Sequence, residues 1–220
     1  MTDLELLQAL APFVSDHKRA LFDRLAPLRT RHVTAVLENS QGSHNASAVV
    51  RTCDLTGVQH MHVIEDQAAF RMNDEITLGS GKWVNVHRHG PPSGREHCLD
   101  ELRQLGYRIV ATSPHASGST PSTIDIDRPM AFCFGTEQDG LSDALMGSAD
   151  EHLRIPMYGF TESFNLSVSV AIVLHTIMER VRASGIAWQL DEAEQVSVKL
   201  GWMRATIQHV DRIEARLRGA

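Results

Sequence analysis

Two polar side chains lie at the two ends of an apolar segment, SHNASAVVRTCD, at residues 43–54. Asn45 lies near the start of this segment, where its side-chain oxygen could cap a helix. Arg51 follows six residues later beside apolar neighbours such as Val49 and Cys53, so its guanidinium should emerge at the margin of a core. A guanidinium in such a place can donate several hydrogen bonds to a phosphate or a carboxylate. The alternative is that Asn45 is only a helix cap and Arg51 only a surface arginine, since both are common.

A second candidate is the segment FCFGTEQDGLS at residues 132–142, in which an apolar run breaks at Gly135 and is followed by Glu137. Glycine lets the backbone approach a ligand closely or adopt a positive φ. Ligands of open α/β sheets bind beyond the carboxyl ends of the strands, where Glu137 would stand. The alternative is an ordinary strand–turn–helix, in which Ser142 caps the next helix.

A third candidate, IPMYGFTESFNLSVSVAIVLHTI at residues 155–177, places polar side chains where a loop enters an apolar helix. Ser163, Asn165, Ser167 and Ser169 gather at this start. Helix N-termini carry free N–H groups and partial positive charge, which suit polar and anionic ligands. The alternative is that Ser163 or Asn165 only caps the helix and that the later serines are small packing residues.

Alternating strands and helices must position these three segments. Apolar, β-branched runs predict strands at residues 32–38, 61–65, 82–88, 107–112, 130–137 and 152–157. Helical spacing predicts helices at residues 3–28 (with a break near Pro12 and Ser15), from Asn45 onward, and at 95–105, 163–183 and 190–217. This alternation indicates an α/β fold with a mostly parallel sheet and helices on both faces. We expect helical extensions at residues 1–30 and 186–220 around a domain at residues 31–185.

The composition is that of an ordinary globular protein, with 42% hydrophobic and 22% charged residues in a chain of 220. The formal net charge of −6 weakly disfavours nucleic-acid binding, which usually needs a basic footprint. Basic side chains nevertheless gather near both ends of the chain. These side chains either lie on solvated faces of helices or bind the phosphates of a nucleic-acid backbone. The candidate RNA-binding residues are Lys18, Arg19, Arg24, Arg29, Arg31 and Arg204.

Cys53, Cys98 and Cys133 are too far apart in sequence for a metal knuckle or a CxxC redox pair, and free thiols suit a reducing cytosol. No N-terminal stretch joins a basic start to an apolar run, so we expect no signal peptide. No segment has the length and apolarity of a membrane span.

Histidines recur with period two at His60 and His62 and again at His87 and His89, so each pair could share a strand face like metal ligands. No third ligand is indicated by the spacing of the sequence. We therefore expect no metal site.

Taken in order, NASAVVRTCDLTGV, FCFGTEQDGLS and IPMYGFTESFNLSVSVAIVLH resemble the three signature motifs of the SpoU/TrmH family of RNA 2′-O-ribose methyltransferases, within the SPOUT superfamily. The resemblance covers residues 32–183 and is greatest to the branch that methylates guanosine in tRNA. It implies a cytoplasmic homodimer with a deep C-terminal trefoil knot and an active site near the subunit interface. It also implies S-adenosylmethionine as cofactor, with the cofactor positions falling on Thr112, Gly135, Ile155 and Phe164.

The same resemblance makes Arg51 the catalytic arginine and matches the other signature polar residues to Asn45, Glu137, Ser163 and Asn165. Because an arginine is normally always protonated, Arg51 would either bind the adjacent phosphate or accept a proton only transiently. The implied substrate is the ribose of guanosine 18 in the tRNA D-loop. The alternatives are another tRNA position, ribosomal RNA, a non-catalytic RNA-binding module with the same fold, or a nucleotide-binding α/β enzyme with no RNA substrate.

Overall fold

The computed structural model describes residues 1–40 and 42–219. The chain divides into two compact units, one at Arg31–Trp188 and one made of Met1–Thr30 together with Gln189–Ala220. The two terminal segments, which we expected as separate extensions, therefore belong to one unit. The second boundary falls after residue 188, beyond the expected residue 185. None of the helices in the described ranges is long and apolar enough to cross a membrane.

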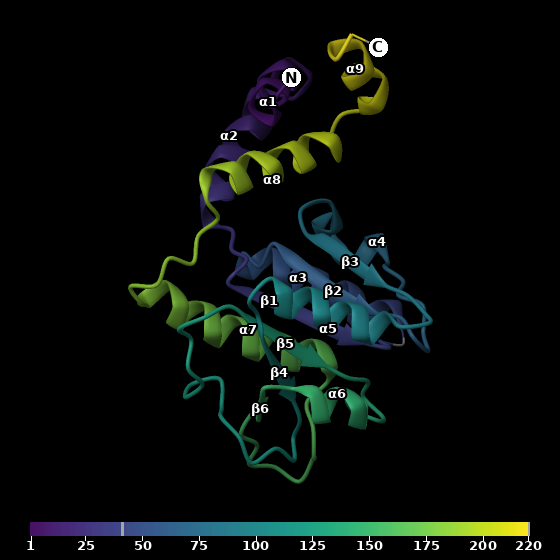
Figure 1. Cartoon of the computed structure of the whole chain (residues 1–220), viewed down its shortest axis with the longest axis vertical. Coiled ribbons are helices and arrows are strands. Elements are labelled where there is room, and N and C mark those ends of the chain that lie inside the picture. Colours follow the sequence, from purple (N-terminus) through teal and green to yellow (C-terminus); the bar gives the residue numbers. More distant parts are fainter. Residues whose placement is uncertain (41, 220) are drawn as a thin grey trace. The chain divides into compact units, whose positions relative to one another are not determined.

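The larger unit contains a parallel six-stranded sheet in the order β3-β2-β1-β5-β4-β6 (Figure 1). All six expected strands are present, and the one expected to reach residue 137 ends at Phe134. The strands are β1 (Val33–Glu38), β2 (His60–Ile64), β3 (Asn85–His89), β4 (Arg108–Thr112), β5 (Met130–Phe134) and β6 (Glu151–Leu153). The predicted α/β fold with a mostly parallel sheet is confirmed.

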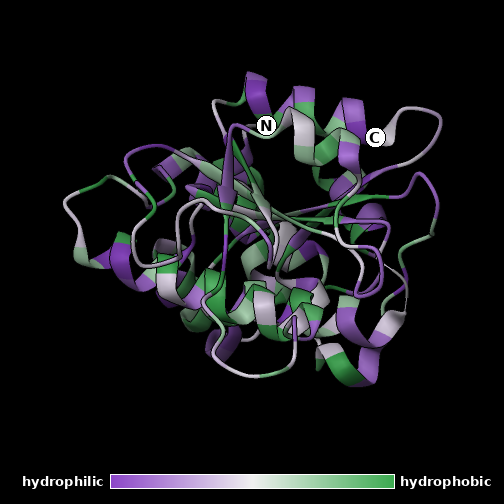
Figure 2. Ribbon diagram, turned by 90° about the horizontal axis from the view of Figure 1, so that it is seen from below, coloured by the Kyte–Doolittle hydropathy of each residue, from purple (hydrophilic) through white to green (hydrophobic). Residues whose placement is uncertain are grey.

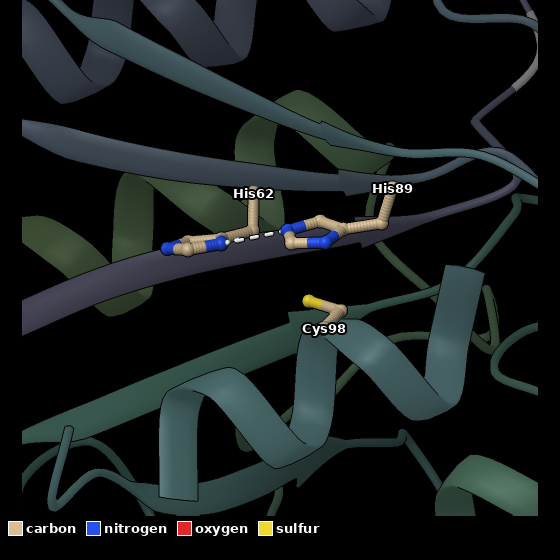
Figure 3. A group of neighbouring side chains, drawn as sticks. All are labelled: His62, His89 and Cys98. Carbon is tan, nitrogen blue, oxygen red and sulfur yellow. Dashed lines mark hydrogen bonds between the residues drawn. The ribbon is translucent and has the colours of Figure 1, made fainter. Parts of the chain in front are cut away.

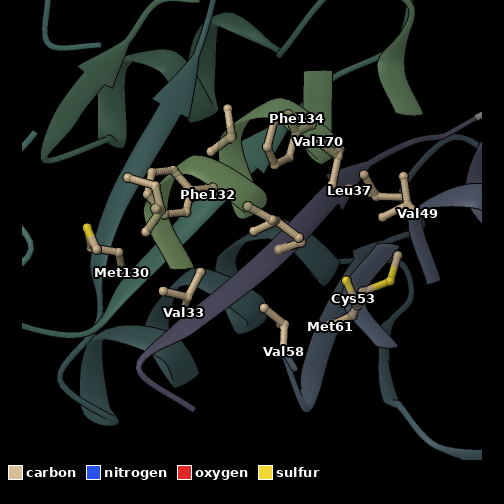
Figure 4. Packing of buried hydrophobic residues seen from close by; sticks show 14 of the residues in the cluster. Val33, Leu37, Val49, Cys53, Val58, Met61, Met130, Phe132, Phe134 and Val170 are labelled. Atoms are coloured by element: carbon tan, nitrogen blue, oxygen red, sulfur yellow. The ribbon is translucent and has the colours of Figure 1, made fainter. Parts of the chain in front are cut away.

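Helices cover both faces of this sheet. They are α3 (Ser43–Thr56), α4 (Asp74–Thr77), α5 (Gly94–Gln104), α6 (Asp143–Ser148) and α7 (Leu166–Ala183), with a short 3-10 turn at Ser80–Lys82. In β1, Leu37 packs in the cluster that α3 and α7 share, and Val36 packs in the opposite cluster with α5 and α6. Figure 4 shows side chains of the first cluster, which includes Phe132, Val49 and Val170. Because successive strand residues point to opposite faces, the burial of all six residues of β1 means that both faces of this strand are covered.

The hydropathy pattern of the helices agrees with this layering. Hydrophobic and hydrophilic residues alternate around the turns of the helices in Figure 2, as expected where one side of a helix is buried and the other is solvated. In α7, for example, Val170, Leu174 and Ile177 are fully buried, and their spacing places them on one side of the helix.

The terminal unit is helical, with α1 (Asp3–Leu10), α2 (Asp16–Leu25), α8 (Glu192–Arg204), α9 (Val210–Leu217) and 3-10 turns at Ala11–Phe13 and Ala26–Leu28. The predicted break between the first two helices is confirmed, but the single helix expected at 190–217 is wrong. The chain reverses before α9, where His209 adopts a left-handed φ of 56°. Arg204 then donates to Glu214 at 2.7 Å, whereas ten residues of continuous helix would span about 15 Å.

Candidate active site

Helix α3 begins earlier than the sequence indicates. Gly42 is its N-cap and has a φ of 91°, a conformation that glycine adopts without steric cost. Asn45 is therefore the third residue of the helix, so the start expected at Asn45 is two residues late and the alternative that Asn45 only caps the helix does not hold. As a result, the amide of Asn45 is available to contact other segments of the chain.

Asn45, Glu137 and Asn165 meet in one hydrogen-bonded group, which we call the amide–carboxylate cluster. Asn165 Nδ2 donates to Asn45 Oδ1 at 3.2 Å and also to Glu137 Oε1. The backbone N–H of Leu166 donates to the same Glu137 oxygen at 3.4 Å. One residue from each of the three sequence motifs therefore contributes to this cluster.

Asn165 has a second task as the N-cap of α7. Its Oδ1 accepts from the backbone N–H of Ser167 at 2.9 Å and from Ser167 Oγ at 2.6 Å. The helix starts at Leu166, so the start expected at residue 163 is three residues early. The side-chain oxygen of Asn165 caps α7, and its side-chain nitrogen belongs to the cluster. Asn165 therefore both caps the helix and contributes to the site. Ser163 stands in the preceding loop.

The loop that carries Glu137 requires a glycine at its start. A Cβ at Gly135 would lie 1.9 Å from the carbonyl carbon of Gly140, because Thr136 and Gly140 pair through two backbone hydrogen bonds of 3.0 and 3.1 Å. Ser142 then caps α6 by accepting from the N–H of Leu145 at 3.2 Å, as the sequence predicts. These contacts close a tight turn that holds Glu137 beyond the carboxyl end of β5.

A cavity of about 340 Å³ adjoins the cluster. Thr112 at the end of β4, Gly135 after β5 and Phe164 before α7 line it. A smaller cavity shares Thr112 and Phe164 with the first and adds Ile155. The four residues that the family resemblance implies for the cofactor thus surround two adjoining cavities. Ser163 lines both of them, and a third cavity beside Asn45 and Glu137 has a volume of about 130 Å³.

The chemistry of the larger cavity suits a compact cationic ligand. Its volume lies at the lower end of the range typical of small-molecule sites. Three carboxylates line it, from Glu137, Asp139 and Glu162, and no lysine or arginine of the described residues does. Leu141 and Phe164 add apolar wall. Asp139 and Glu162 were not predicted from the sequence, although each lies within two residues of a predicted site residue.

Arg51 stands apart from these groups. Its side chain is exposed near the middle of α3 and lines none of the three cavities. It forms no hydrogen bond or ion pair with any residue of the described ranges. Six helical residues separate Arg51 from Asn45 by about 9 Å along the axis and about 120° around it. The expectation that the two face one cleft is not met within a single chain.

The expected RNA-contacting residues differ in their availability. Lys18 and Arg24 are exposed on α2, and Arg31 is exposed before β1. Arg19 is partly occupied by an ion pair with Asp16.

Two further members of the expected set have close partners. Arg204 binds Glu214, and this ion pair raises the pKa of Arg204. Arg29 is only 4% exposed, and its guanidinium lies 5.2 Å from the ring centroid of Trp202. Burial over an aromatic ring removes Arg29 from the surface, so we leave it out of the proposed RNA-contacting set.

A parallel sheet with a polar cavity beyond the carboxyl ends of β4 and β5 defines a ligand-binding α/β protein. The chain belongs to the SpoU rRNA Methylase family, whose model matches residues 32–175.

The chain is similar along most of its length to curated relatives. It is 38% identical to a tRNA (guanosine(18)-2′-O)-methyltransferase of Borreliella burgdorferi, covering 96% of this chain and 95% of the relative. It is 31% identical to the Aquifex aeolicus protein of the same name, covering 72% of this chain and 74% of the relative.

Two solved structures extend the likeness. The crystal structure of the A. aeolicus TrmH/SpoU tRNA modifying enzyme matches with a TM-score of 0.77 and 28% identity, covering 86% of this chain and 97% of that one. The SpoU methyltransferase AviRb of Streptomyces viridochromogenes, solved in complex with AdoMet, matches with a TM-score of 0.61 and 22% identity over 74% of this chain and 65% of that one. The second likeness shows the fold alone.

Proposed function

We propose that the protein is an S-adenosylmethionine-dependent methyltransferase that modifies the 2′ oxygen of guanosine 18 in the D-loop of tRNA. The observation that carries this proposal is the meeting of Asn45, Glu137 and Asn165 beside a carboxylate-lined cavity. The Borreliella burgdorferi relative, which is named for this reaction, matches 96% of the chain, and this favours tRNA over ribosomal RNA as substrate. A tRNA substrate would place the protein in the cytoplasm.

The two adjoining cavities would hold the cofactor. Ile155 and Phe164 offer apolar walls, and the tight turn at Gly135 brings backbone close to the ligand. S-adenosylmethionine, when bound, supplies a sulfonium-activated methyl group. The carboxylates of Glu137, Asp139 and Glu162 favour a cation in this cavity over an anion. The amide–carboxylate cluster keeps the loops after β5 and before α7 in one fixed arrangement, which is how positioning lowers a reaction barrier.

Arg51 would bind a phosphate next to the target ribose. Its guanidinium is exposed and forms no hydrogen bond or ion pair within the described residues, so its donors are available to a substrate. A fixed positive charge beside the 2′ hydroxyl favours loss of the proton to a nearby phosphate or to water, and arginine itself is a poor base. The protein would act as a homodimer with the active site near the interface between copies. Such a site explains why Arg51 lines no cavity of its own chain.

The C-terminal part of the domain would form the trefoil knot implied by the family. Residues 113–129, which join β4 to β5, bond β6 through the N–H of Ser119, which donates to His152 O at 3.1 Å. From α7, Arg180 donates to the carbonyls of Pro121 and Ile124 at 2.8 and 2.7 Å. Contacts of this loop with both β6 and α7 support a chain that threads through it.

Exposed basic residues would hold the RNA backbone. Lys18, Arg24 and Arg31 are exposed to solvent and would contact phosphates. Arg19 and Arg204 would have to exchange their intramolecular carboxylate partners, Asp16 and Glu214. Phosphate contacts position a substrate without reading its sequence, so these residues would contribute affinity and not the choice of nucleotide. Replacing Lys18 by glutamine should weaken tRNA binding and reduce its salt dependence by roughly one counterion.

Methyl transfer from labelled S-adenosylmethionine to purified tRNA, followed by mapping of the modified nucleotide, tests the function. We expect label at guanosine 18, and a transcript with adenosine at that position should accept none. Label on ribosomal RNA or on another tRNA nucleotide would instead support the alternative substrates. Absence of transfer to any RNA, with binding retained, would support a non-catalytic module.

The role of Arg51 has its own test. Arg51→Ala should lower methyl transfer by about 100- to 1,000-fold, the cost of removing one preorganised charged donor, while cofactor affinity stays nearly unchanged. Arg128→Ala is a matched control, because Arg128 is also an exposed arginine but lies just before the N-terminal end of β5, whereas the candidate site lies beyond its carboxyl end. Loss of cofactor binding in the Arg51 variant, or equal loss of turnover in both variants, would refute the assignment.

A further inference from the structure

Four histidines form a ladder on the face of β2 and β3 that α5 covers. We call His60, His62, His87 and His89 the histidine ladder. His60 Nδ1 and His87 Nε2 lie 2.9 Å apart, and His62 Nδ1 and His89 Nε2 lie 3.0 Å apart, so each pair shares one hydrogen bond. The rings of His62 and His87 stack between the two pairs, with centroids 4.7 Å apart. Parallel register of the two strands places these side chains on one face, as their period of two requires.

Cys98 supplies a third candidate ligand, which the spacing of the sequence does not indicate. It lies on α5, is fully buried, and points from the helix toward the rings of His62 and His89 (Figure 3). One ligand atom from each of these three residues lies within 4.8 Å of the other two. Both imidazoles are also buried, at 3% exposure for His62 and 9% for His89. Cys53 is buried in the cluster on the opposite face of the sheet, and Cys133 is buried in the same apolar cluster as Cys98, but neither belongs to this group.

We propose that His62, His89 and Cys98 form a binding site for a zinc-class divalent transition metal ion. Two imidazole nitrogens and one thiolate are the ligands that such borderline ions prefer, whereas calcium and magnesium require oxygen. Ligand atoms of a tetrahedral zinc site lie about 3.3 to 3.8 Å apart, so side-chain shifts on the order of 1 Å close this group around an ion. A water molecule completes the fourth position.

The protonation states fit this assignment. Burial, reinforced by the charge that a protonated His87 would carry, lowers the pKa of His62 to about 3, so the ring is neutral at physiological pH. Burial raises the pKa of the Cys98 thiol, so the metal must displace one proton from sulfur. The proton shared by His62 and His89 moves to the far nitrogen of one ring. His89 Nδ1 lies 4.0 Å from Glu101 Oε2, so a shift on the order of 1 Å lets the protonated nitrogen donate a hydrogen bond to this carboxylate.

The site has a structural role that does not depend on the proposed methyl transfer. His62, His89 and Cys98 line none of the three cavities of the candidate active site. A bound ion joins α5 to β2 and to the edge strand β3, and it therefore stabilises the fold by its binding free energy. Removing the metal should lower the unfolding temperature and leave the methyl-transfer cavity intact.

Titration of the chelator-treated protein with Co²⁺ tests the site, because a cobalt–thiolate bond gives an intense near-ultraviolet charge-transfer absorption. We expect this absorption to saturate at one Co²⁺ per chain and to disappear when Zn²⁺ is added in excess. Cys98→Ser should abolish it, and Glu101→Gln should weaken binding about 10- to 100-fold as loss of an orienting carboxylate does. Cys53→Ser, a change at another buried thiol, and His87→Gln, a change at a neighbouring ring outside the group, should both retain it.

Two results would overturn the proposal. One is an absence of charge-transfer absorption in the parent chain, which would leave the three side chains as ordinary core residues. The other is absorption that persists in Cys98→Ser, which would place the metal on another thiol. If Cys98→Ser does not fold, the parent chain still decides the question, because Zn²⁺ must raise its unfolding temperature and His62→Gln must remove that rise.

Discussion

The amide–carboxylate cluster and the histidine ladder are both polar groups inside an α/β unit, but they are built in opposite ways. Glu137 and Asn165 are exposed and come from segments far apart in sequence. The ladder comes from two adjacent strands and is covered by α5, with His62 almost wholly buried. A cluster at the mouth of a cavity can meet a ligand as large as a nucleotide. A covered ladder can take only a small ion, and it influences the stability of the fold above all.

The largest expected effect of breaking the cluster is on turnover. Asn165→Ala removes the donor that joins Asn45 to Glu137, so the two loops lose their fixed arrangement. Misplacement of a reacting group by about 1 Å can cost 100-fold in rate, and we expect a loss of at least that size in methyl transfer. The lost helix cap should cost only about 1 kcal/mol of stability.

Asn73→Ala is the matched control for this variant. Asn73 also caps a helix, because its Oδ1 accepts from the N–H of Glu75 at 2.9 Å, but it lies outside the three cavities. The two variants should lose similar stability, whereas only the Asn165 variant should lose turnover. Steady-state methyl transfer and urea unfolding measure the two quantities. Equal turnover in both variants would show that the cluster does not position the site.

The ladder should instead make stability depend on pH. Burial is the main cause that lowers the pKa of His60 to about 4 and that of His62 to about 3, below the value of 6.5 for an unfolded chain. The unfolded state therefore binds protons first on acidification, and stability present above pH 6.5 is lost as the pH falls toward 4. The slope should be at most about 1.4 kcal/mol per pH unit for each histidine.

Urea unfolding of the metal-free protein between pH 7 and 5 measures this slope. His62→Gln should flatten it, because one buried group no longer titrates between the folded and unfolded states. His97→Gln is a useful control, since His97 is an exposed histidine on α5. A slope that is unchanged in the His62 variant would show that carboxylates elsewhere in the chain carry the acid sensitivity.

The difference between the two regions also explains what the sequence could predict. Local patterns identified the six strands, and Ser142 was identified as the cap of α6 from its place before a helical run. Residues of the cluster were found because they stand beside glycines and helix starts, which are local signals. Their meeting was expected from the order of three motifs that resemble a family, because spacing alone does not bring residues 45, 137 and 165 together.

Other features depend on choices that local patterns do not encode. The start of α3 was wrongly expected at Asn45, because Gly42 with its positive φ starts that helix earlier. The break before α9 depends on a left-handed His209 and on the pairing of Arg204 with Glu214 across the bend. Cys98 could not be joined to the histidines, because the sequence does not say which helix covers which strands.

Gly135→Ala tests whether the loop that carries Glu137 contributes to cofactor binding. The added methyl group would lie 1.9 Å from the Gly140 carbonyl carbon, so backbone must shift. Overpacking of this kind costs about 1–3 kcal/mol, and we expect a matching loss of cofactor affinity measured by calorimetry. Gly147→Ala, in α6, has nothing within 4 Å of its new methyl group and should be slightly stabilising. Unchanged cofactor affinity in the Gly135 variant would show that this turn is not part of the cofactor site.

The smallest expected effect concerns the hydrogen bond that supports Asn165 from its own helix. Ser167→Ala removes the donor at 2.6 Å from Asn165 Oδ1 but leaves the backbone N–H of Ser167 bonded to the same oxygen. One partner therefore remains, and the loss of stability should be about 1 kcal/mol or less with only a few-fold fall in turnover. Ser184→Ala removes a comparable bond at the other end of α7, where Ser184 Oγ donates to Val181 O at 2.7 Å, and it should spare turnover. If Ser167→Ala abolishes activity while Ser184→Ala does not, the hydroxyl itself must contact substrate or cofactor, and the cluster would include a fourth member.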